Sequence, residues 1–525
     1  MRVMNMKKAI SNTQLLLATV LTAALLLAPA AFAAVPGITG PTFNLTAQAE
    51  YLTQPDGSSV YSWGYGCNGA PAGYKPSAIA GAFCNAMQVP GPTLIVQQGD
   101  TVVVNLVNNL PTAAGNTSIL FPGFNVTSST GAGTARGLLT QEAATGGTVT
   151  YTFTATTPGT RAYYSGTQGD LQVEMGMYGA IIVLPSATPA ECASGVHNSN
   201  LLAQGLHGED DFRLASAAYN HPGACYDREY IFQFSEMDAR IHREAQQQST
   251  RACTGCMSVA TEPYVPAYFM INGRSMPDDM DPNYAREYPH QPYNGNPHMH
   301  PGELVLLRIV GQGRWQHPFH EHGNHVRVLA RDGNLILSTT SPSDPNLAGP
   351  LLFTTTTTPG QAIDGIYYWT GKGLNWDPYG HNSASGSTLP CNPDTNGYNT
   401  GGTAYQAINY FEWCQDHNKP LQSTPTGDVA GGGPATLPDP NIFANGAWFG
   451  GSPYLGPDAT VRAVGSTGTT PPSGTVANSP ADEAGFAFMW HSHNEREITT
   501  NNIFPGGMMM MMLVDSREFA INESN

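Results

Sequence analysis

Turn-forming residues occur so often in this chain that they argue against long helices as its main building element. The 525 residues include 58 glycines and 41 prolines, and only 12% of all residues are charged. Soluble domains usually carry about 25% charged residues, which long surface helices need for their solvated faces. Glycine and proline instead mark turns between short strands. With 41% hydrophobic residues available for cores, this composition excludes global disorder and predicts an all-β protein.

Alternating stretches in the first part of the chain predict a β-sandwich. Residues 89–110 and 146–156 alternate apolar and polar side chains, as half-buried strands do. Residues 176–185 form a continuous apolar run that suits a strand inside a sandwich core. We therefore expect a first β unit over residues 42–186.

The second part of the chain repeats this pattern. Residues 301–310 (PGELVLLRIV) mirror the earlier PGPTLIVQQGDTVVVNLV region, which predicts a second β unit over residues 225–515 after a linker at 187–224. Residues 371–482 are rich in Gly, Pro, Asn, Ser and Thr. A structureless loop of that length is uncommon in a compact domain, so we interpret this stretch as a loop-rich insertion with turns of its own.

The N-terminus has the features of a secretory signal. Arg2, Lys7 and Lys8 precede an apolar run, and Ala31-Phe32-Ala33 resembles a cleavage site. We expect residues 1–34 to be a signal peptide, with an uncleaved anchor as the alternative. The protein is then exported: periplasmic, at the cell surface or extracellular. The net charge is −17 and no basic run lies beyond the N-terminus, which argues against nucleic acid as a partner.

Eight cysteines in an exported protein favour disulfide bonds. Cys67 with Cys84 and Cys391 with Cys414 are the expected local pairs, because each pair closes a short, turn-rich loop. Cys253-Thr-Gly-Cys256 could be a redox or zinc half-motif, but a lone motif of this kind is weak. We expect a structural bridge there.

Eight of the 15 histidines fall in three short clusters: His298-Met-His300, His317-Pro-Phe-His320-Glu-His322-Gly-Asn-His325 and His491-Ser-His493. Residues i and i+2 of a strand share a face, so His320 pairs with His322 and His491 pairs with His493. Imidazole is the commonest protein ligand for copper, zinc and iron. Two facing strands of this kind predict a four-nitrogen metal site, with His317 at its edge. We expect His298 and His300 to be a surface pair.

The run Met508–Met512 has two interpretations. Thioethers bind Cu(I), which suggests copper handling. Methionine also fills irregular space in cores. Because alternate residues of a strand face opposite ways, only some of these side chains could share a metal. We therefore favour a core strand.

Several segments resemble the multicopper oxidase family of cupredoxin domains. These are HPFHEHG with the downstream WHSH, QVPGPTLIVQQGD, PGTRAYYSGTQGDLQVEMGMYGAIIVLP and TPGQAIDGIYYWTGKG. With two such units, the chain is similar to two-domain laccase-like and nitrite-reductase-like members. The resemblance implies two cupredoxin-like Greek-key β-sandwiches, copper as cofactor, and a homotrimer. That family oxidises phenols, amines or metal ions and reduces oxygen at a three-copper cluster, and related members reduce nitrite.

Carried over residue by residue, the resemblance assigns His317 to the mononuclear blue copper and His320 and His322 to the copper cluster. The family's later H-C-H motif falls on His491, Ser492 and His493, so serine replaces the thiolate. Its next blue-copper histidine falls on Glu497. A blue copper site needs a soft thiolate together with imidazoles, so ordinary laccase activity is not expected.

The first unit departs further from the family pattern. The family's H-W-H-G falls on Leu120-Phe121-Pro122-Gly123, and its H-S-H falls on Tyr164-Ser165-Gly166. All four cluster ligands of this unit are therefore missing. We expect Leu120, Pro122, Tyr164 and Gly166 to occupy the old ligand positions without binding metal.

Three functions remain open from the sequence. The first is an exported copper-binding protein with a reduced metal site formed by His317, His320, His322, His491 and His493, and with atypical oxidoreductase activity. The second is a non-catalytic cupredoxin scaffold for binding, assembly or copper sequestration. The third is a Lewis-acid site of zinc type, with Glu321 or Glu497 as base.

Overall fold

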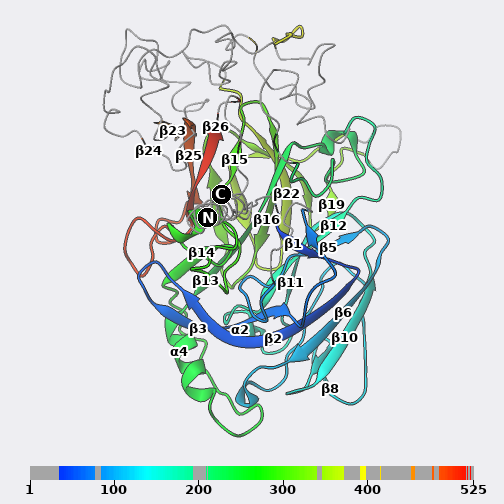
Figure 1. Cartoon of the computed structure of the whole chain (residues 1–525), viewed down its shortest axis with the longest axis vertical. Helices are drawn as coiled ribbons and strands as arrows, with labels where there is room; N and C mark the ends of the chain where they lie inside the picture. The colour runs from blue at the N-terminus through cyan, green and yellow to red at the C-terminus, as the bar shows by residue number, and fades with distance from the viewer. Residues whose placement is uncertain are drawn as a thin grey trace, which may run out of the picture.

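The structure is a computed structural model that describes residues 35–76, 84–192, 209, 211–339, 346–371, 391–397, 414, 451–455, 476–477, 484–515, 517 and 521. The expected signal peptide and most of the expected 371–482 insertion lie outside these residues. Within them the chain forms two β-sandwich units, as predicted. Figure 1 shows the first unit in blue and cyan below the second, in green to red.

The first unit packs two five-stranded sheets face to face. One sheet has the order β11 (Gly159–Tyr164), β12 (Tyr178–Leu184), β5 (Leu94–Gln97), β1 (Gly37–Thr39) and β4 (Tyr74–Lys75). The other has the order β3 (Ser59–Cys67), β2 (Thr42–Thr53), β6 (Thr101–Asn108), β10 (Thr148–Thr154) and β7 (Thr127–Ser128). A separate hairpin joins β8 (Thr134–Arg136) to β9 (Gln141–Ala143).

The second unit is built from two seven-stranded sheets. The first contains β14 (Tyr268–Ile271), β13 (Arg228–Met237), β16 (Leu304–Gly311), β22 (Ala362–Tyr368), β18 (Val326–Arg331), β19 (Asn334–Leu335) and β20 (Leu351–Leu352). The second contains β15 (His298–Met299), β26 (Met509–Asp515), β25 (Ala484–Ser492), β17 (His317–Glu321), β21 (Thr354–Thr357), β23 (Gly451–Leu455) and β24 (Val476–Ala477).

The strand order repeats between the units, which agrees with the repeated sequence pattern. In the first unit β2 lies parallel to β6, which lies antiparallel to β10. In the second, β13 lies parallel to β16, which lies antiparallel to β22. The other sheets also correspond. In the first unit β12 pairs antiparallel with β11 and parallel with β5. In the second unit β26 pairs antiparallel with β25 and parallel with β15. These central strands of one unit therefore have counterparts in the other.

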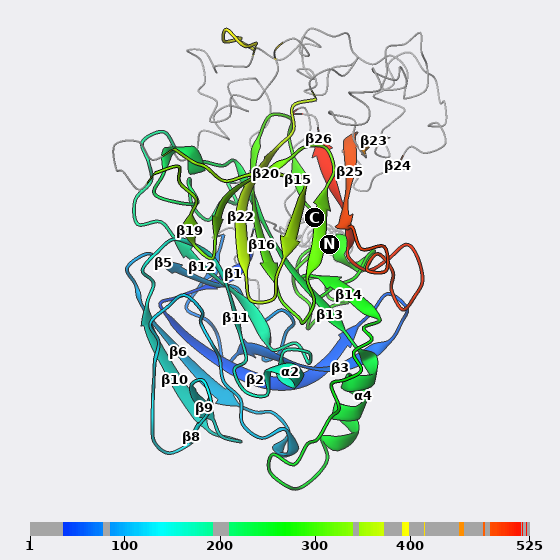
Figure 2. The same cartoon turned by 180° about the vertical axis from the view of Figure 1, so that it is seen from behind.

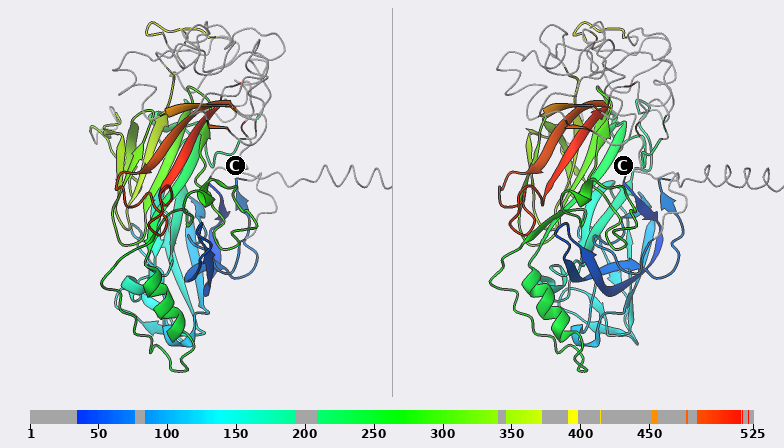
Figure 3. Two further views of the ribbon diagram at one scale, coloured as in Figure 1. Left: turned by 90° about the vertical axis from the view of Figure 1, so that its left-hand side faces the viewer. Right: turned by 60° about the vertical axis from the view of Figure 1, so that its left-hand side comes forward.

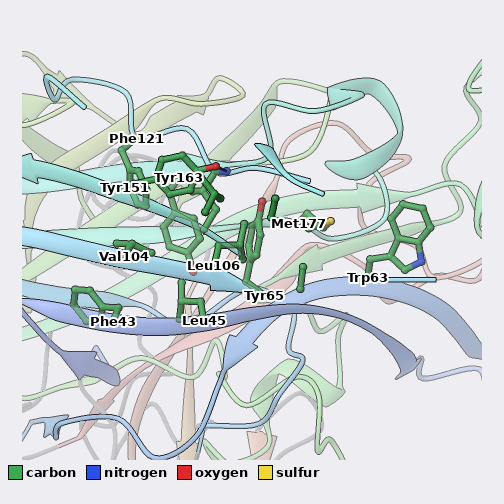
Figure 4. Close-up of a cluster of buried hydrophobic side chains, with 14 of the residues drawn as sticks. Phe43, Leu45, Trp63, Tyr65, Val104, Leu106, Phe121, Tyr151, Tyr163 and Met177 are labelled. Carbon is green, nitrogen blue, oxygen red and sulfur yellow. Dashed lines mark hydrogen bonds between the residues drawn. The ribbon is translucent and has the colours of Figure 1, made fainter. Parts of the chain in front are cut away.

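Alternation along the strands explains how the first core forms. In β6 the side chains of Val102, Val104 and Leu106 are buried, and the residues between them are partly exposed. Figure 4 shows how side chains of β2 and β6 gather with Tyr65 and the aromatic rings beyond them in one cluster. The continuous apolar strand β12 is buried along its whole length, as its sequence predicts.

Helix is scarce in the described residues. The short elements are α2 (Gly169–Gln172), η1 (Thr112–Ala114), η2 (Pro222–Ala224) and η3 (Asp278–Met280), and only α4 (Ala239–Gln248) exceeds two turns. Asp238 caps α4 by accepting a hydrogen bond from the Arg240 amide at 2.9 Å. Although α4 follows a strand of the second unit, Ile241 and Ala245 belong to the first unit's core, and Figure 3 shows the helix beside that unit.

Buried contacts join the two units into one body. β11 of the first unit lies against β16 and β22 of the second, as Figure 2 shows. The amide and hydroxyl of Thr160 donate to the Asp364 carboxylate at 3.0 and 2.6 Å. Ile95 and Ile182 share an apolar cluster with Ile231 and Val310.

Four disulfides use all eight cysteines. The predicted pairs Cys67–Cys84 and Cys391–Cys414 are confirmed, and the CxxC motif forms the structural bridge expected of it. The fourth bridge joins Cys192 to Cys225.

No helix in the described part of the chain has the length and apolar character needed to cross a membrane.

Candidate metal centre

Strand pairing in the second unit brings the two H-x-H motifs together. β17 and β25 run antiparallel, with His320 directly opposite His491. His322 and His493 lie two residues further along their own segments. Because i and i+2 share a face, these imidazoles extend from the same side of the sheet. We call the set of His320, His322, His491 and His493 the histidine cluster.

The four rings are close to one another. His320 lies 4.7 Å from His322, 4.9 Å from His493 and 5.6 Å from His491 between ring centroids. The His322 and His491 rings are 5.1 Å apart, and their Nε2 atoms are separated by 3.2 Å. Two nitrogens bound to one tetrahedral metal at about 2.0–2.1 Å would lie roughly 3.3 Å apart. The closest pair therefore already has the spacing of two ligands on one ion.

The cluster is not a finished coordination shell. Among the described residues no three His, Cys, Asp or Glu side chains are grouped as a metal site, so a shared ion requires the other rings to turn toward the His322–His491 pair. His320 and His491 are buried, whereas the side chain of His493 is 55% exposed. Solvent therefore reaches the cluster from the His493 side.

Burial keeps the imidazoles of His320 and His491 neutral by lowering their pKa values. Burial, followed by the nearby rings of His322, His491 and His493, lowers the pKa of His320 to about 4. Burial also lowers the pKa of His491. Nδ1 of His491 donates to the carbonyl oxygen of Ser492 at 2.7 Å, which leaves Nε2 with its lone pair facing His322. Neutral imidazole is the form that binds a metal.

His317 does not join the cluster. Its Nδ1 donates to Glu497 and its Nε2 donates to Glu236, and each of these hydrogen bonds is 2.9 Å long. All three side chains are buried. Burial by itself lowers the pKa of His317, but the hydrogen bonds and charges of the two carboxylates outweigh it and raise the pKa to about 9. In this arrangement both ring nitrogens carry protons, so neither can ligate a metal.

Ser492 and Glu497 belong to the same hydrogen-bonded group as His317. They stand at the positions where the family has its thiolate and its second blue-copper imidazole. The Ser492 hydroxyl donates to Glu497 Oε2 at 2.5 Å, and Asn494 Nδ2 donates to Oε1 at 2.9 Å. Glu236 accepts the amides of Arg314 and Trp315 at 2.8 and 2.9 Å. A buried Glu236–His317–Glu497 ion cluster therefore occupies the region where the family resemblance would place a blue copper site.

Sequence reasoning missed Glu236 as part of this region. Its only signal was a carboxylate in strand β13 (REYIFQFSEM), whose ten residues are all buried. A buried charge needs a partner, but the partner, His317, lies 81 residues further along the chain.

The first unit presents the same geometry without ligands. Leu120 and Tyr164 form an isolated antiparallel bridge, which is the counterpart of the His320–His491 pairing. A Cβ added at Gly166 would lie 2.8 Å from the Leu120 side chain, so leucine fills the space beside it. Leu120, Tyr164 and Gly166 line a cleft instead.

His298 and His300 are buried, so the expectation of a surface pair is wrong. Nδ1 of His298 lies 2.9 Å from Asp515, and Nε2 of His300 lies 2.7 Å from Glu209. These carboxylates are 217 and 91 residues away in the chain. Only the packing of distant segments supplies the partners that allow these rings to be buried.

Four of the five methionines, Met509–Met512, lie in the core strand β26, and Met508 directly precedes it. Met508, Met510 and Met512 are buried in the main apolar cluster of the second unit. This placement agrees with the core-strand interpretation of the run.

Comparisons with known proteins agree with the two-unit architecture. Residues 75–188 and 260–364 each match a family profile described as multicopper oxidase. An L-ascorbate oxidase of Brassica rapa subsp. pekinensis is 38% identical over 96 residues, 18% of this chain and 16% of that protein. Multicopper oxidase MCE of Talaromyces pinophilus is 34% identical over 117 residues, 22% of this chain and 18% of that protein. The match thus spans less than a fifth of either relative.

Among solved structures, a blue copper oxidase from Nitrosomonas europaea is similar with a TM-score of 0.42 and 15% identity, over 90% of this chain and 85% of that one. The two profile matches fall one on each sandwich unit, and the units repeat the same strand order. The chain therefore contains two multicopper oxidase domains, at residues 75–188 and 260–364.

Proposed function

We propose that this protein binds copper at the histidine cluster and acts as an exported, atypical member of its family with a reduced metal site in the second unit. The observation that carries the proposal is the 3.2 Å separation of the His322 and His491 Nε2 atoms within a group of four imidazoles. Nitrogen ligands suit copper, and zinc is the alternative ion.

The surrounding residues support a ligand role for the cluster. The Ser492 carbonyl holds the His491 ring through Nδ1, and Thr354 Oγ1 lies 2.9 Å from Nδ1 of His320. Such outer contacts orient imidazoles whose other nitrogen binds a metal. Bound copper would supply one-electron chemistry at a site that solvent reaches past His493.

The same residues argue against ordinary laccase turnover. The position of the thiolate holds Ser492, whose hydroxyl is engaged by Glu497, and the first unit offers Leu120 and Tyr164 in place of ligands. These features also favour a second candidate function, a non-catalytic scaffold that sequesters copper.

Four disulfides suit the oxidising compartment that export implies. The trimer implied by the resemblance is part of this proposal, and light scattering checks it.

Metal analysis of the protein purified from the exported fraction tests the proposal. We expect about one copper ion per chain, since one four-nitrogen set holds one ion. The double variant His322→Ala/His491→Ala should lose most of it, because the closest ligand pair is removed. Elemental analysis and copper titration measure both quantities.

His325→Ala is the matched control, because His325 belongs to the same sequence motif but is exposed and lies outside the cluster. It should keep its copper. Three or four coppers per chain would refute a reduced site, and bound zinc in place of copper would favour the Lewis-acid function. Copper that persists in the double variant would refute the assignment of the cluster.

A further inference from the structure

A cleft of about 910 Å³ opens where the first unit lacks its metal ligands. Leu120, Tyr164 and Gly166 of the first unit line it together with Gly313 and Gly360 of the second. Small-molecule sites in proteins usually measure 300–1,000 Å³ and combine apolar walls with a few polar groups. The cleft has the size and position of a binding site that is separate from the histidine cluster.

Glu142 supplies a negative charge to this cleft. Its carboxylate accepts hydrogen bonds from Asn116 Nδ2 at 3.0 Å and from Thr167 Oγ1 at 2.8 Å. In the described part of the chain no salt bridge to Glu142 is found. A carboxylate has about four acceptor positions, so two neutral donors hold it in place without neutralising it or using all its capacity.

The basic residue of the cleft is already neutralised. Arg314 pairs with Glu262 at 2.7 Å, and its guanidinium stacks 4.1 Å from the centroid of the Tyr264 ring. The charge that remains for a ligand is therefore the negative charge of Glu142. The net charge of the chain, −17, also favours a cationic ligand over an anionic one.

The walls of the cleft suit an aliphatic body. Leu120 and Val173 line it, and so do Leu138 and Leu139 at the tip of the β8–β9 hairpin. These two leucines are 94% and 65% exposed. Exposed leucines beside a concave surface are stabilised when an apolar ligand covers them, because their apolar surface is then removed from water. Gly115 and Gly255, which also line the cleft, add no side chains that would fill it.

We propose that this cleft binds an amphipathic cation, an aliphatic chain that ends in a protonated amine. The ammonium group would donate to Glu142, and the chain would lie along Leu120, Val173 and the two hairpin leucines. This proposal does not depend on the proposed copper site, since none of the four cluster histidines lines the cleft.

Calorimetric titration of the full protein with n-octylamine at pH 7 tests this proposal, with n-octanol as the uncharged analogue. Octylamine should bind, and octanol should bind about tenfold more weakly or worse because it lacks the charge-assisted hydrogen bond. Glu142→Gln, which keeps the shape of the side chain, should lower the octylamine affinity by about tenfold or more. The exposed Glu50→Gln is the matched control and should bind normally.

A second variant tests the apolar walls without touching the core. Leu138→Ser/Leu139→Ser should weaken octylamine binding by about tenfold. The His322→Ala/His491→Ala protein should bind octylamine with unchanged affinity, which separates this site from the copper site. Equal affinities for octanol and octylamine, or full binding by Glu142→Gln, would overturn the proposal. It would also fail if light scattering showed that the native chains associate and that the leucine variant dissociates. That result would mean that a second copy of the chain covers the cleft.

Discussion

Replacing His317 by leucine is expected to lower the free energy of unfolding by about 3–5 kcal/mol, the cost of removing one partner from a buried ion pair. His317 is the cation between Glu236 and Glu497, and its removal leaves two buried carboxylates without a positive partner. The triple variant His317→Leu/Glu236→Gln/Glu497→Gln should recover much of the loss, because it removes both charges as well. Guanidinium-induced unfolding followed by circular dichroism measures both changes.

The exposed His325→Leu is the control and should unfold like the native protein, since surface substitutions usually change stability by less than about 0.5 kcal/mol. If His317→Leu unfolded like the native protein, the ion cluster would contribute no stability. If the triple variant were as unstable as the single variant, lost packing would explain the effect better than lost charge.

The raised pKa of His317 also predicts a pH dependence. The folded protein holds this proton up to about pH 9, whereas an unfolded histidine releases it near pH 6.5. The stabilisation is therefore fully present below pH 6.5 and is lost as the pH rises through 9. The difference in unfolding free energy between native protein and His317→Leu should shrink over that window by roughly 3 kcal/mol. A difference that stayed constant or grew with pH would contradict a protonated His317.

The copper-loaded protein is expected to lack the intense thiolate-to-copper absorption that makes blue copper proteins blue. A serine hydroxyl is a hard donor that keeps its proton, and in this structure it donates to Glu497. Ser492→Cys alone should remain colourless, because Glu497 still engages Nδ1 of His317 and its charge disfavours a thiolate beside it. Visible absorption spectra of copper-titrated proteins test this expectation.

Ser492→Cys/Glu497→His is expected to restore the colour without restoring oxygen reduction. The double change supplies a thiolate and an imidazole and frees Nδ1 of His317, which together form a blue copper ligand set. The first unit would still place Leu120 and Tyr164 at its counterpart of the histidine cluster. Blue colour or brisk oxidation of phenols by the unmodified protein would show that the assignment of Ser492 to the thiolate position is wrong.

The sequence by itself determined the features that depend on local pattern. Alternation along 102–106 decides which side chains of β6 enter the core, because the side-chain period of a strand is two. The same period places His320 with His322 and His491 with His493. Short loops made Cys67–Cys84 and Cys391–Cys414 predictable, and the internal repeat indicated two β units.

Tertiary structure alone decided which distant groups meet, because one sequence read along the chain carries no record of long-range contacts. His317 belongs to a motif that predicts a ligand, yet Glu236 and Glu497, 81 and 180 residues away, hold both its nitrogens. His298 and His300 are buried because Asp515 and Glu209 reach them across the fold. The cleft beside Glu142 exists only because the packed units face each other there. A buried ionisable side chain is stable only with its partner in place, and folding, not spacing, brings that partner.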